Sequence, residues 1–133
     1  MIRAVYRCFS EARLEALDEV IPLDAALIQD PSFPDARMWH GPDGVKKWFS
    51  QIAAQFGTVR IEPVDLLQDG DHALATVEID VQGRTSGAQA RHRMAHLWSF
   101  RGETIAACRF YLDVDEGRAR YDDLRTSTTD VAT

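Results

Sequence analysis

The sequence predicts an α+β fold, in which helices from the first half of the chain pack on an antiparallel sheet formed by the second half. Apolar residues recur at helical spacing in the first half, most clearly between Asp43 and Gly57. From Thr58 onward they alternate with polar residues, as in strands that bury one face. The longest such stretch, Ala88 to Asp113, contains Gly102-Glu103, which fits a two-residue hairpin turn with glycine first.

The first helical region is short and ends at a proline. Ile2, Val5 and Phe9 fall at helical spacing, and residues 14–20 continue the apolar stripe in a second short helix that Pro22 ends. Residues 25–29 form an apolar run that predicts a short strand.

A loop and the strongest helix follow. Residues 31–41 contain prolines and are predicted to be a loop. Asp43 can cap the next helix, and Gly57 ends it. The apolar stripe of that helix consists of Val45, Trp48, Phe49, Ile52 and Phe56.

The second half reads as four strands. Pro63 lies inside the first of them, residues 59–67, and predicts an edge strand or a bulge. A turn at Asp69-Gly70-Asp71 leads to the alternating strand 72–82, and the long hairpin follows. After Asp113 the chain becomes polar. We therefore expect one domain over residues 1–125 and a polar C-terminal tail over residues 126–133.

Composition and charge exclude several classes of protein. The chain has 133 residues, of which 45% are hydrophobic, and a formal net charge of −6. This charge disfavours nucleic acid as a partner. Charges interrupt the N-terminal apolar residues, so we do not expect a signal peptide there. No run approaches the roughly 20 apolar residues that span a bilayer. Cys8 and Cys108 suggest no disulfide framework. We expect a cytoplasmic protein that does not bind a membrane.

Several short motifs follow one another along the chain. They are Tyr6-Arg7-Cys8-Phe9-Ser10 with Leu14-Glu15-Ala16-Leu17, Asp30-Pro31, Trp39-His40-Gly41-Pro42-Asp43-Gly44-Val45, Ala95-His96-Leu97-Trp98-Ser99-Phe100 and Tyr111-Leu112-Asp113. In order and spacing they resemble the SnoaL-like branch of the nuclear transport factor 2-like superfamily. The resemblance implies a cone-shaped α+β barrel with a deep apolar pocket, usually in a dimer. Members include ketosteroid isomerases, polyketide cyclases, dehydratases and epoxide hydrolases, so the fold alone does not identify the function.

Asp30 is the first candidate catalytic residue. In ketosteroid isomerases the general base is an aspartate followed by proline at the end of the corresponding strand, and Asp30-Pro31 resembles it. A carboxylate at the mouth of an apolar pocket has a raised pKa, which makes it a stronger base. The alternative is that Asp30 begins a loop and caps local backbone amides.

His96 is the second candidate, and its orientation is open at this stage. By resemblance it occupies the position of an acid that hydrogen-bonds the developing oxyanion, a role that an imidazole N–H can fill. Regular hairpin pairing places His96 opposite Arg109, on the face away from Cys108 and Phe110. A one-residue β-bulge would reverse this. Without the bulge, His96 and Trp98 would serve a subunit interface.

The remaining predicted site residues are ligand-binding candidates. They are Tyr6, Phe33, Trp39, Trp48, Ile52, Phe56, Arg93, Phe110 and Leu112. The tyrosine of the isomerases corresponds to Val5, and Tyr6 is turned about 100° from it on a helix. The last-strand aspartate of epoxide hydrolases corresponds to Phe110. The helical stripe that includes Trp48 can also be plain core.

No metal site is predicted. His92 and His96 on one strand lie about 13 Å apart, which is too far for two ligands of one ion. No cluster of cysteines or carboxylates supplies further ligands.

Two functional hypotheses follow. The first is cofactor-independent proton transfer on a small apolar carbonyl compound, giving isomerisation or cyclisation, with Asp30 as the base and His96 or Arg93 stabilising the enolate. The second is non-catalytic binding of a small hydrophobic molecule. We also expect a homodimer that packs through the sheet, because the long hairpin is apolar on both faces and helices were expected to cover only one.

Overall fold

The computed structural model describes residues 2–10, 13–28, 38–56, 58–82 and 89–132. Its elements are α1 (Ile2–Ser10), the 3₁₀ helix η1 (Leu14–Glu19), β1 (Ala26–Ile28), β2 (Met38–His40), α2 (Gly41–Phe56), β3 (Thr58–Asp69), β4 (His72–Gln82), β5 (Gln89–Arg101), β6 (Thr104–Tyr111) and α3 (Val114–Ala132). The predicted α+β class is confirmed. Among the described helices, none is long and apolar enough to cross a membrane.

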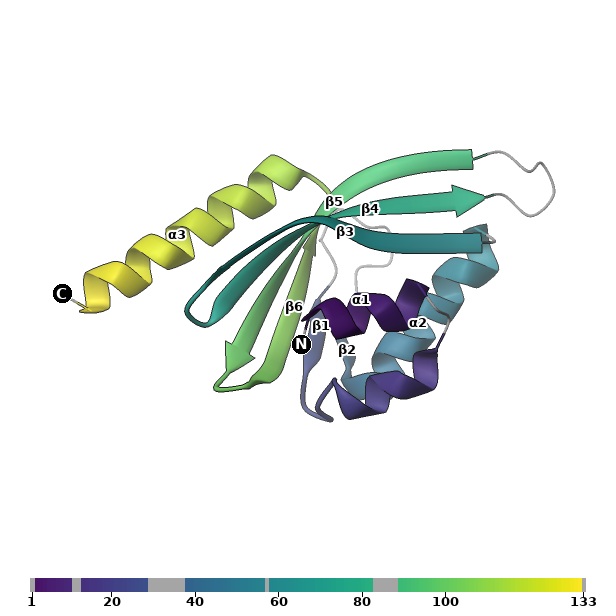
Figure 1. Ribbon diagram of the computed structural model, residues 1–133, viewed down its shortest axis with the longest axis horizontal. Coiled ribbons are helices and arrows are strands. Elements are labelled where there is room, and N and C mark those ends of the chain that lie inside the picture. The colour runs from purple at the N-terminus through teal and green to yellow at the C-terminus, as the bar shows by residue number, and fades with distance from the viewer. Residues whose placement is uncertain (1, 11–12, 29–37, 57, 83–88, 133) are drawn as a thin grey trace.

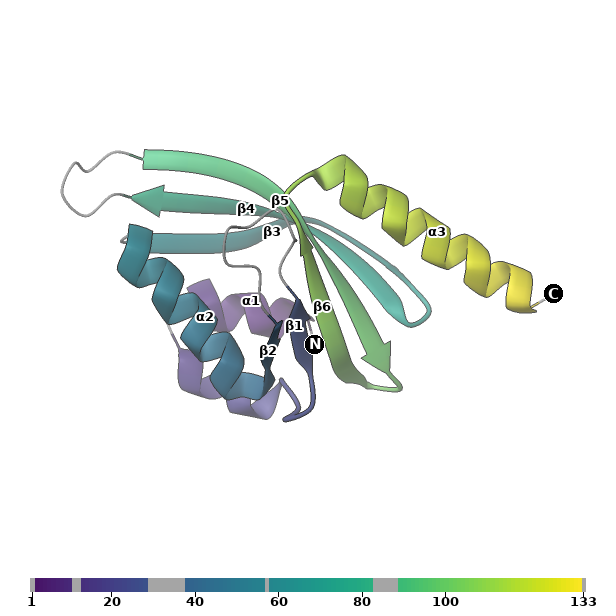
Figure 2. The ribbon, with the colours of Figure 1, turned by 180° about the vertical axis from the view of Figure 1, so that it is seen from behind.

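The strands form one curved sheet in the order β2-β1-β6-β5-β4-β3. All neighbours pair antiparallel except β1 and β6, which are parallel. Helices α1 and α2 lie inside the curve, and α3 lies on the opposite side of the sheet (Figure 1). The view from behind shows the same arrangement, with the sheet bent around α1 and α2 (Figure 2). The expected cone is therefore an open one, since the sheet does not close.

Strand β2 lies in the segment that we expected to be a loop, and it leads directly into α2. Gly41, at the junction, has a φ of 67° and donates its backbone N–H to the Ala25 carbonyl over 2.9 Å. A Cβ on Gly41 would lie 2.9 Å from the Leu23 carbonyl oxygen. Glycine is therefore required both for the backbone conformation and for the close approach. The rest of the expected loop, residues 31–37, lies outside the described residues.

Strand β3 confirms both readings of Pro63. It is an edge strand of the sheet, and its pairing with β4 shifts register between Pro63 and Asp65. Proline cannot donate a backbone hydrogen bond, so a sheet edge next to a bulge accommodates it. The predicted turn at Gly70-Asp71 and the strand His72–Gln82 are also as expected.

The hairpin of β5 and β6 contains the one-residue irregularity on which the orientation of His96 depended. Phe100 pairs with Ile105 as predicted, but the register shifts between Ser99 and Phe100, so that His96 pairs with Phe110 rather than Arg109. Residues that pair across strands share a face. His96 therefore points to the same side as Phe110, towards α1 and α2. The interface role for His96 and Trp98 is excluded by their burial inside the chain.

The sheet has a hydrophobic core on each side. The larger one lies between the sheet and helices α1 and α2. The smaller one consists of Leu74, Ala95, Leu97 and Tyr121, with Leu124 packed against it. Tyr121 and Leu124 belong to α3, so a helix of the same chain covers the second face of the hairpin. The stated reason for a homodimer was wrong on this point, and the homodimer itself stays a prediction.

Helix α3 occupies the chain after Asp113, which we expected to be polar and to end in a tail. The Asp113 carboxylate accepts the backbone N–H of Asp115 over 2.9 Å and thereby caps the helix. One turn later the helix touches the sheet, since a Cβ on Gly117 would lie 2.6 Å from the Cβ of Ala95. Only a residue without a side chain allows the helix to approach so closely.

Candidate functional site

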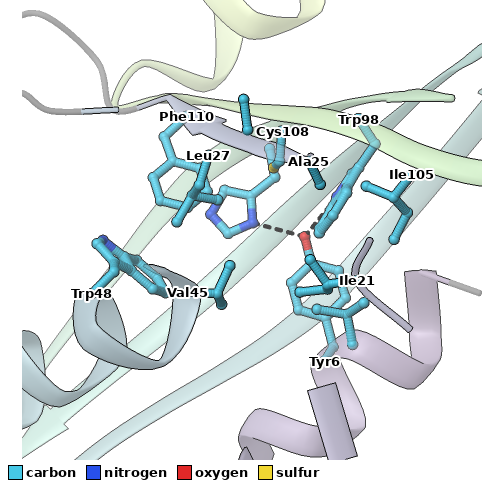
Figure 3. A pocket seen from close by; sticks show the side chains of 13 residues that line it. Tyr6, Ile21, Ala25, Leu27, Val45, Trp48, Trp98, Ile105, Cys108 and Phe110 are labelled. Carbon is cyan, nitrogen blue, oxygen red and sulfur yellow. Dashed lines mark hydrogen bonds between the residues drawn. The ribbon is translucent and has the colours of Figure 1, made fainter. Parts of the chain in front are cut away.

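A small cavity lies between the inner helices and the concave face of the sheet (Figure 3). Its volume is about 20 Å³, which is close to the room needed for one water molecule. The walls come from α1, β1, α2, β5 and β6 and from the segment after η1. They are Val5, Tyr6, Ile21, Ala25, Ala26, Leu27, Val45, Trp48, His96, Trp98, Ile105, Cys108 and Phe110.

The polar groups of the cavity form a chain of two hydrogen bonds that meet at the Tyr6 hydroxyl (Figure 3). The indole N–H of Trp98 donates to the Tyr6 oxygen over 3.1 Å. The Tyr6 oxygen lies 2.7 Å from Nδ1 of His96. An indole nitrogen can only donate, so the Tyr6 oxygen accepts from Trp98 and its own proton is available for His96.

This arrangement favours one tautomer of His96. In that tautomer Nδ1 accepts the Tyr6 proton, and the remaining proton of the neutral ring is on Nε2. Nε2 is buried and has no hydrogen-bond partner among the described residues. His96 is 2% exposed, so bulk solvent does not reach this group. The Nε2–H of His96 is therefore a buried donor without an acceptor among the described residues.

Burial determines the charge state of the three titratable cavity residues. It lowers the pKa of His96 to about 3, so the imidazole is neutral at physiological pH. Burial also raises the pKa of Tyr6, with a further increase from the neighbouring Cys108 and a decrease from the Trp98 hydrogen bond. The Cys108 pKa is raised by burial as well. None of the three is a useful base near neutral pH.

Aromatic contacts hold the imidazole in place. Its ring stacks on Phe110 with centroids 4.3 Å apart, and Phe110 in turn lies 5.0 Å from the Trp48 ring. The rings of Tyr6 and His96 are within 13° of parallel, and Trp98 meets Tyr6 edge-on at 85°. The stack on Phe110 and the hydrogen bond to Tyr6 hold His96 in one orientation, which is a requirement for a preorganised donor.

The structure brings together four of the residues predicted from the sequence. Tyr6, Trp48, His96 and Phe110 all line this cavity. Sequence reasoning missed Trp98 as a member of the site, because its side could not be assigned without the bulge. The Tyr6 hydroxyl reaches the site although its position on α1 is one residue beyond that of the isomerase tyrosine.

Three other predicted ligand-binding residues lie away from the cavity walls. Trp39 and Leu112 are partly buried against the inner core but do not line the cavity. Arg93 does not reach it, because its side chain is 62% exposed and lies 3.5 Å from Glu78 on the neighbouring strand. Arg93 is therefore not placed to stabilise an enolate in this cavity.

The remaining predicted residues cannot be placed in the site. Asp30 and Phe33 lie outside the described residues, as do the side chains of Ile52 and Phe56. The cavity walls within the described part of the chain contain no carboxylate. Nor do those described residues contain a group of three or more histidines, cysteines or carboxylates that could hold a metal ion.

Comparisons with known proteins give a match to one protein family and a set of solved structures with the same fold. A model described as a SnoaL-like domain matches residues 2–108. No curated protein sequence matches the chain.

Solved structures share the fold at low sequence identity. One is a hypothetical protein from Catenulispora acidiphila with a ketosteroid isomerase-like fold, in complex with trimethylamine (17% identity, TM-score 0.70, 83% of this chain and 82% of that one). Another is TerC co-crystallised with polyporic acid (17%, 0.73, 89% and 92%). A third is IdmH, a putative polyketide cyclase from Streptomyces antibioticus (19%, 0.68, 82% and 86%).

Proposed function

The chain belongs to the SnoaL-like domain family, and from this premise we propose that it binds a small, mainly apolar molecule with one hydrogen-bond-accepting oxygen, such as a carbonyl compound. The family fold supports a role in small-molecule binding or in isomerase or cyclase chemistry. The choice of ligand class rests on a single observation, the unpartnered Nε2–H of His96 in an otherwise apolar cavity.

Leaving that donor unsatisfied destabilises the empty cavity. A buried donor without an acceptor costs about 1–3 kcal/mol. A ligand oxygen that accepts the His96 Nε2–H removes this cost, whereas a hydrocarbon of the same shape does not. A trimethylammonium ion fits less well, because an N–H donor repels it and the described cavity walls contain no carboxylate to balance its charge.

The volume of the cavity limits the size of the ligand. Small-molecule pockets typically measure about 300–1,000 Å³, whereas this cavity measures about 20 Å³. Any ligand larger than a few atoms must therefore displace wall side chains. Related folds are found with ligands of very different size, as the trimethylamine and polyporic acid complexes show.

A pair of ligands of the same shape tests the proposal. Cyclopentanone and methylenecyclopentane differ mainly in whether they can accept a hydrogen bond. We expect cyclopentanone to bind roughly tenfold or more tightly and to shift the ¹⁵N resonance of His96 Nε2 in NMR titrations. Acetone and cyclohexanone, titrated in the same way, measure how far the walls can move. Equal binding of the two matched ligands would contradict the assignment of His96 as the recognition group.

A second candidate function is proton transfer on the bound carbonyl compound. An N–H donor held in a dry cavity is the group that stabilises an enolate oxygen. The described walls lack a base, and Asp30 follows β1 by two residues, the strand from which Ala26 and Leu27 line the cavity. Asp30 as the base would complete the isomerase-like pair.

Hydrogen–deuterium exchange at the α-carbon of cyclopentanone tests this second function. If Asp30 is the base, the protein should accelerate the exchange, and Asp30→Asn should abolish the acceleration while leaving cyclopentanone binding intact. A wild-type protein that binds cyclopentanone without accelerating exchange would be a binding protein only.

A further inference from the structure

We propose that Trp98 is the specificity-determining residue of the cavity: through the Tyr6 hydroxyl it fixes the tautomer of His96, so that the site offers a donor and not an acceptor. The consequence for ligands rests on the proposed binding function. The consequence for the tautomer does not, and it can be measured without any ligand.

The Trp98 indole sets the direction of the two hydrogen bonds. The Trp98 indole nitrogen has a proton and no lone pair available for accepting, so it must donate to the Tyr6 oxygen. That contact occupies one side of the hydroxyl. His96 Nδ1 lies 2.7 Å from the same oxygen, and the hydroxyl proton can be donated to it.

The alternative tautomer of His96 would leave the Tyr6 hydroxyl proton without an acceptor. With a proton on Nδ1, the imidazole would donate to Tyr6, and the hydroxyl proton would have to turn away from it. In this buried place that proton would have no acceptor, because the neighbouring Trp98 N–H is itself a donor. The Tyr6 hydroxyl has no other hydrogen-bond partner among the described side chains, and Tyr6 is 2% exposed. Nε2 has no partner in either tautomer, so the two forms differ in whether the Tyr6 proton has an acceptor.

The tautomer of His96 determines which ligands the cavity can bind. Nε2 is the ring nitrogen without a partner, so its protonation state decides whether a ligand there must accept or donate a hydrogen bond. In the tautomer fixed by Trp98, Nε2 can donate to a carbonyl oxygen but cannot accept from an N–H or O–H group. A donor ligand must first reverse the tautomer against the indole N–H. Trp98 thus disfavours donor ligands, although it acts on His96 only through the Tyr6 hydroxyl.

The tautomer is tested by ¹⁵N NMR of the imidazole in the intact protein. In the wild type we expect Nε2 to resonate as a protonated nitrogen and Nδ1 as an unprotonated one. In Trp98→Phe the opposing donor is gone, and both resonances should move towards intermediate values. Trp48→Phe is the matched control, because it makes the same substitution on another wall of the cavity and leaves the Tyr6 hydroxyl contacts in place. It should retain the wild-type pattern.

Should Trp98→Phe fail to fold, the benzothiophene isostere of tryptophan at position 98 replaces the N–H by sulfur and keeps the shape. The proposal is overturned if the wild type has its proton on Nδ1, or if both position-98 variants keep the wild-type resonances.

A binding experiment compares cyclopentanone, which can only accept hydrogen bonds, with pyrrole, whose N–H is a donor. The wild type should prefer cyclopentanone, and in Trp98→Phe this preference should fall roughly tenfold, the equivalent of one buried group regaining a partner. An unchanged preference would overturn the specificity role of Trp98. Failure of both ligands to bind the wild type would count against the proposed function, while the tautomer measurement would still decide the proposal.

Discussion

Acidification from about pH 7.5 to about pH 5 should lower the free energy of unfolding by about 2 kcal/mol through His96 alone. Burial lowers the pKa of this imidazole to about 3 in the folded protein. In the unfolded chain its pKa returns to about 6.5. The unfolded state therefore takes up a proton as the pH falls below about 6.5, while the folded state does not until about pH 3.

The sign and size follow from this difference. Because the unfolded state binds more protons throughout this window, acid favours unfolding. Each pKa unit corresponds to about 1.36 kcal/mol, so the 1.5 units between pH 6.5 and pH 5 give about 2 kcal/mol. The loss should continue down to about pH 3, where the folded protein also becomes protonated. The stabilisation from His96 is complete above about pH 6.5.

Urea unfolding across this pH range measures the effect. Other groups contribute to the pH dependence, so the relevant quantity is the difference between the wild type and His96→Asn, which can keep an acceptor near Tyr6 but does not titrate. The wild type should lose about 2 kcal/mol more than this variant between about pH 7.5 and pH 5. His92→Asn, on the exposed part of the same strand, is the matched control and should follow the wild type. Parallel curves for the wild type and His96→Asn would refute the neutral, buried imidazole.

Two further predictions concern single contacts. Tyr6→Phe should cost roughly 2–4 kcal/mol, because the Trp98 N–H and the His96 Nδ1 both lose a buried partner. Tyr121→Phe, in the outer core, should cost less than about 1 kcal/mol, and equal losses in urea titrations would contradict the hydrogen-bond chain. Gly117→Ala should cost about 1–3 kcal/mol despite alanine's higher helix propensity, because its Cβ would lie 2.6 Å from that of Ala95. Adding Ala95→Gly should recover part of the melting temperature, whereas a single variant that melts like the wild type would show that α3 does not dock at Gly117.

The order of helices and strands could be predicted because it is set by local patterns. Alternation over His72–Gln82 matches β4 at both ends. The position of Pro63 indicated both an edge strand and a bulge, since proline tolerates few places in a sheet. The glycine at the hairpin turn, Gly102, has the positive φ that such turns require.

Helix α3 could not be recognised by the same means, because its apolar stripe is narrow. Gly117, Tyr121 and Leu124 are spaced four and three residues apart, which is one face of a helix, but the residues between them are charged except for Ala119. The signal that could have revealed the helix is Asp113 followed by Asp115 and Glu116, a cap and an acidic first turn. Its omission had a consequence beyond the helix itself. Without α3, the second face of the hairpin seemed to need another subunit.

The identity of the site depended on a feature that residue patterns do not encode. One extra residue in β6 decides whether His96 faces the inner helices or the opposite side, because side chains alternate along a strand. The sequence alone did not decide on which face of the sheet His96 lies. Once the bulge places His96 inside, a hydroxyl 90 positions away along the chain becomes its partner, and an indole from the same strand becomes the partner of that hydroxyl. The residue types at positions 6, 96 and 98 are thus necessary for the donor site, but the bulge brings them onto one face, and a variant that restored regular pairing there would abolish the site without changing any of the three.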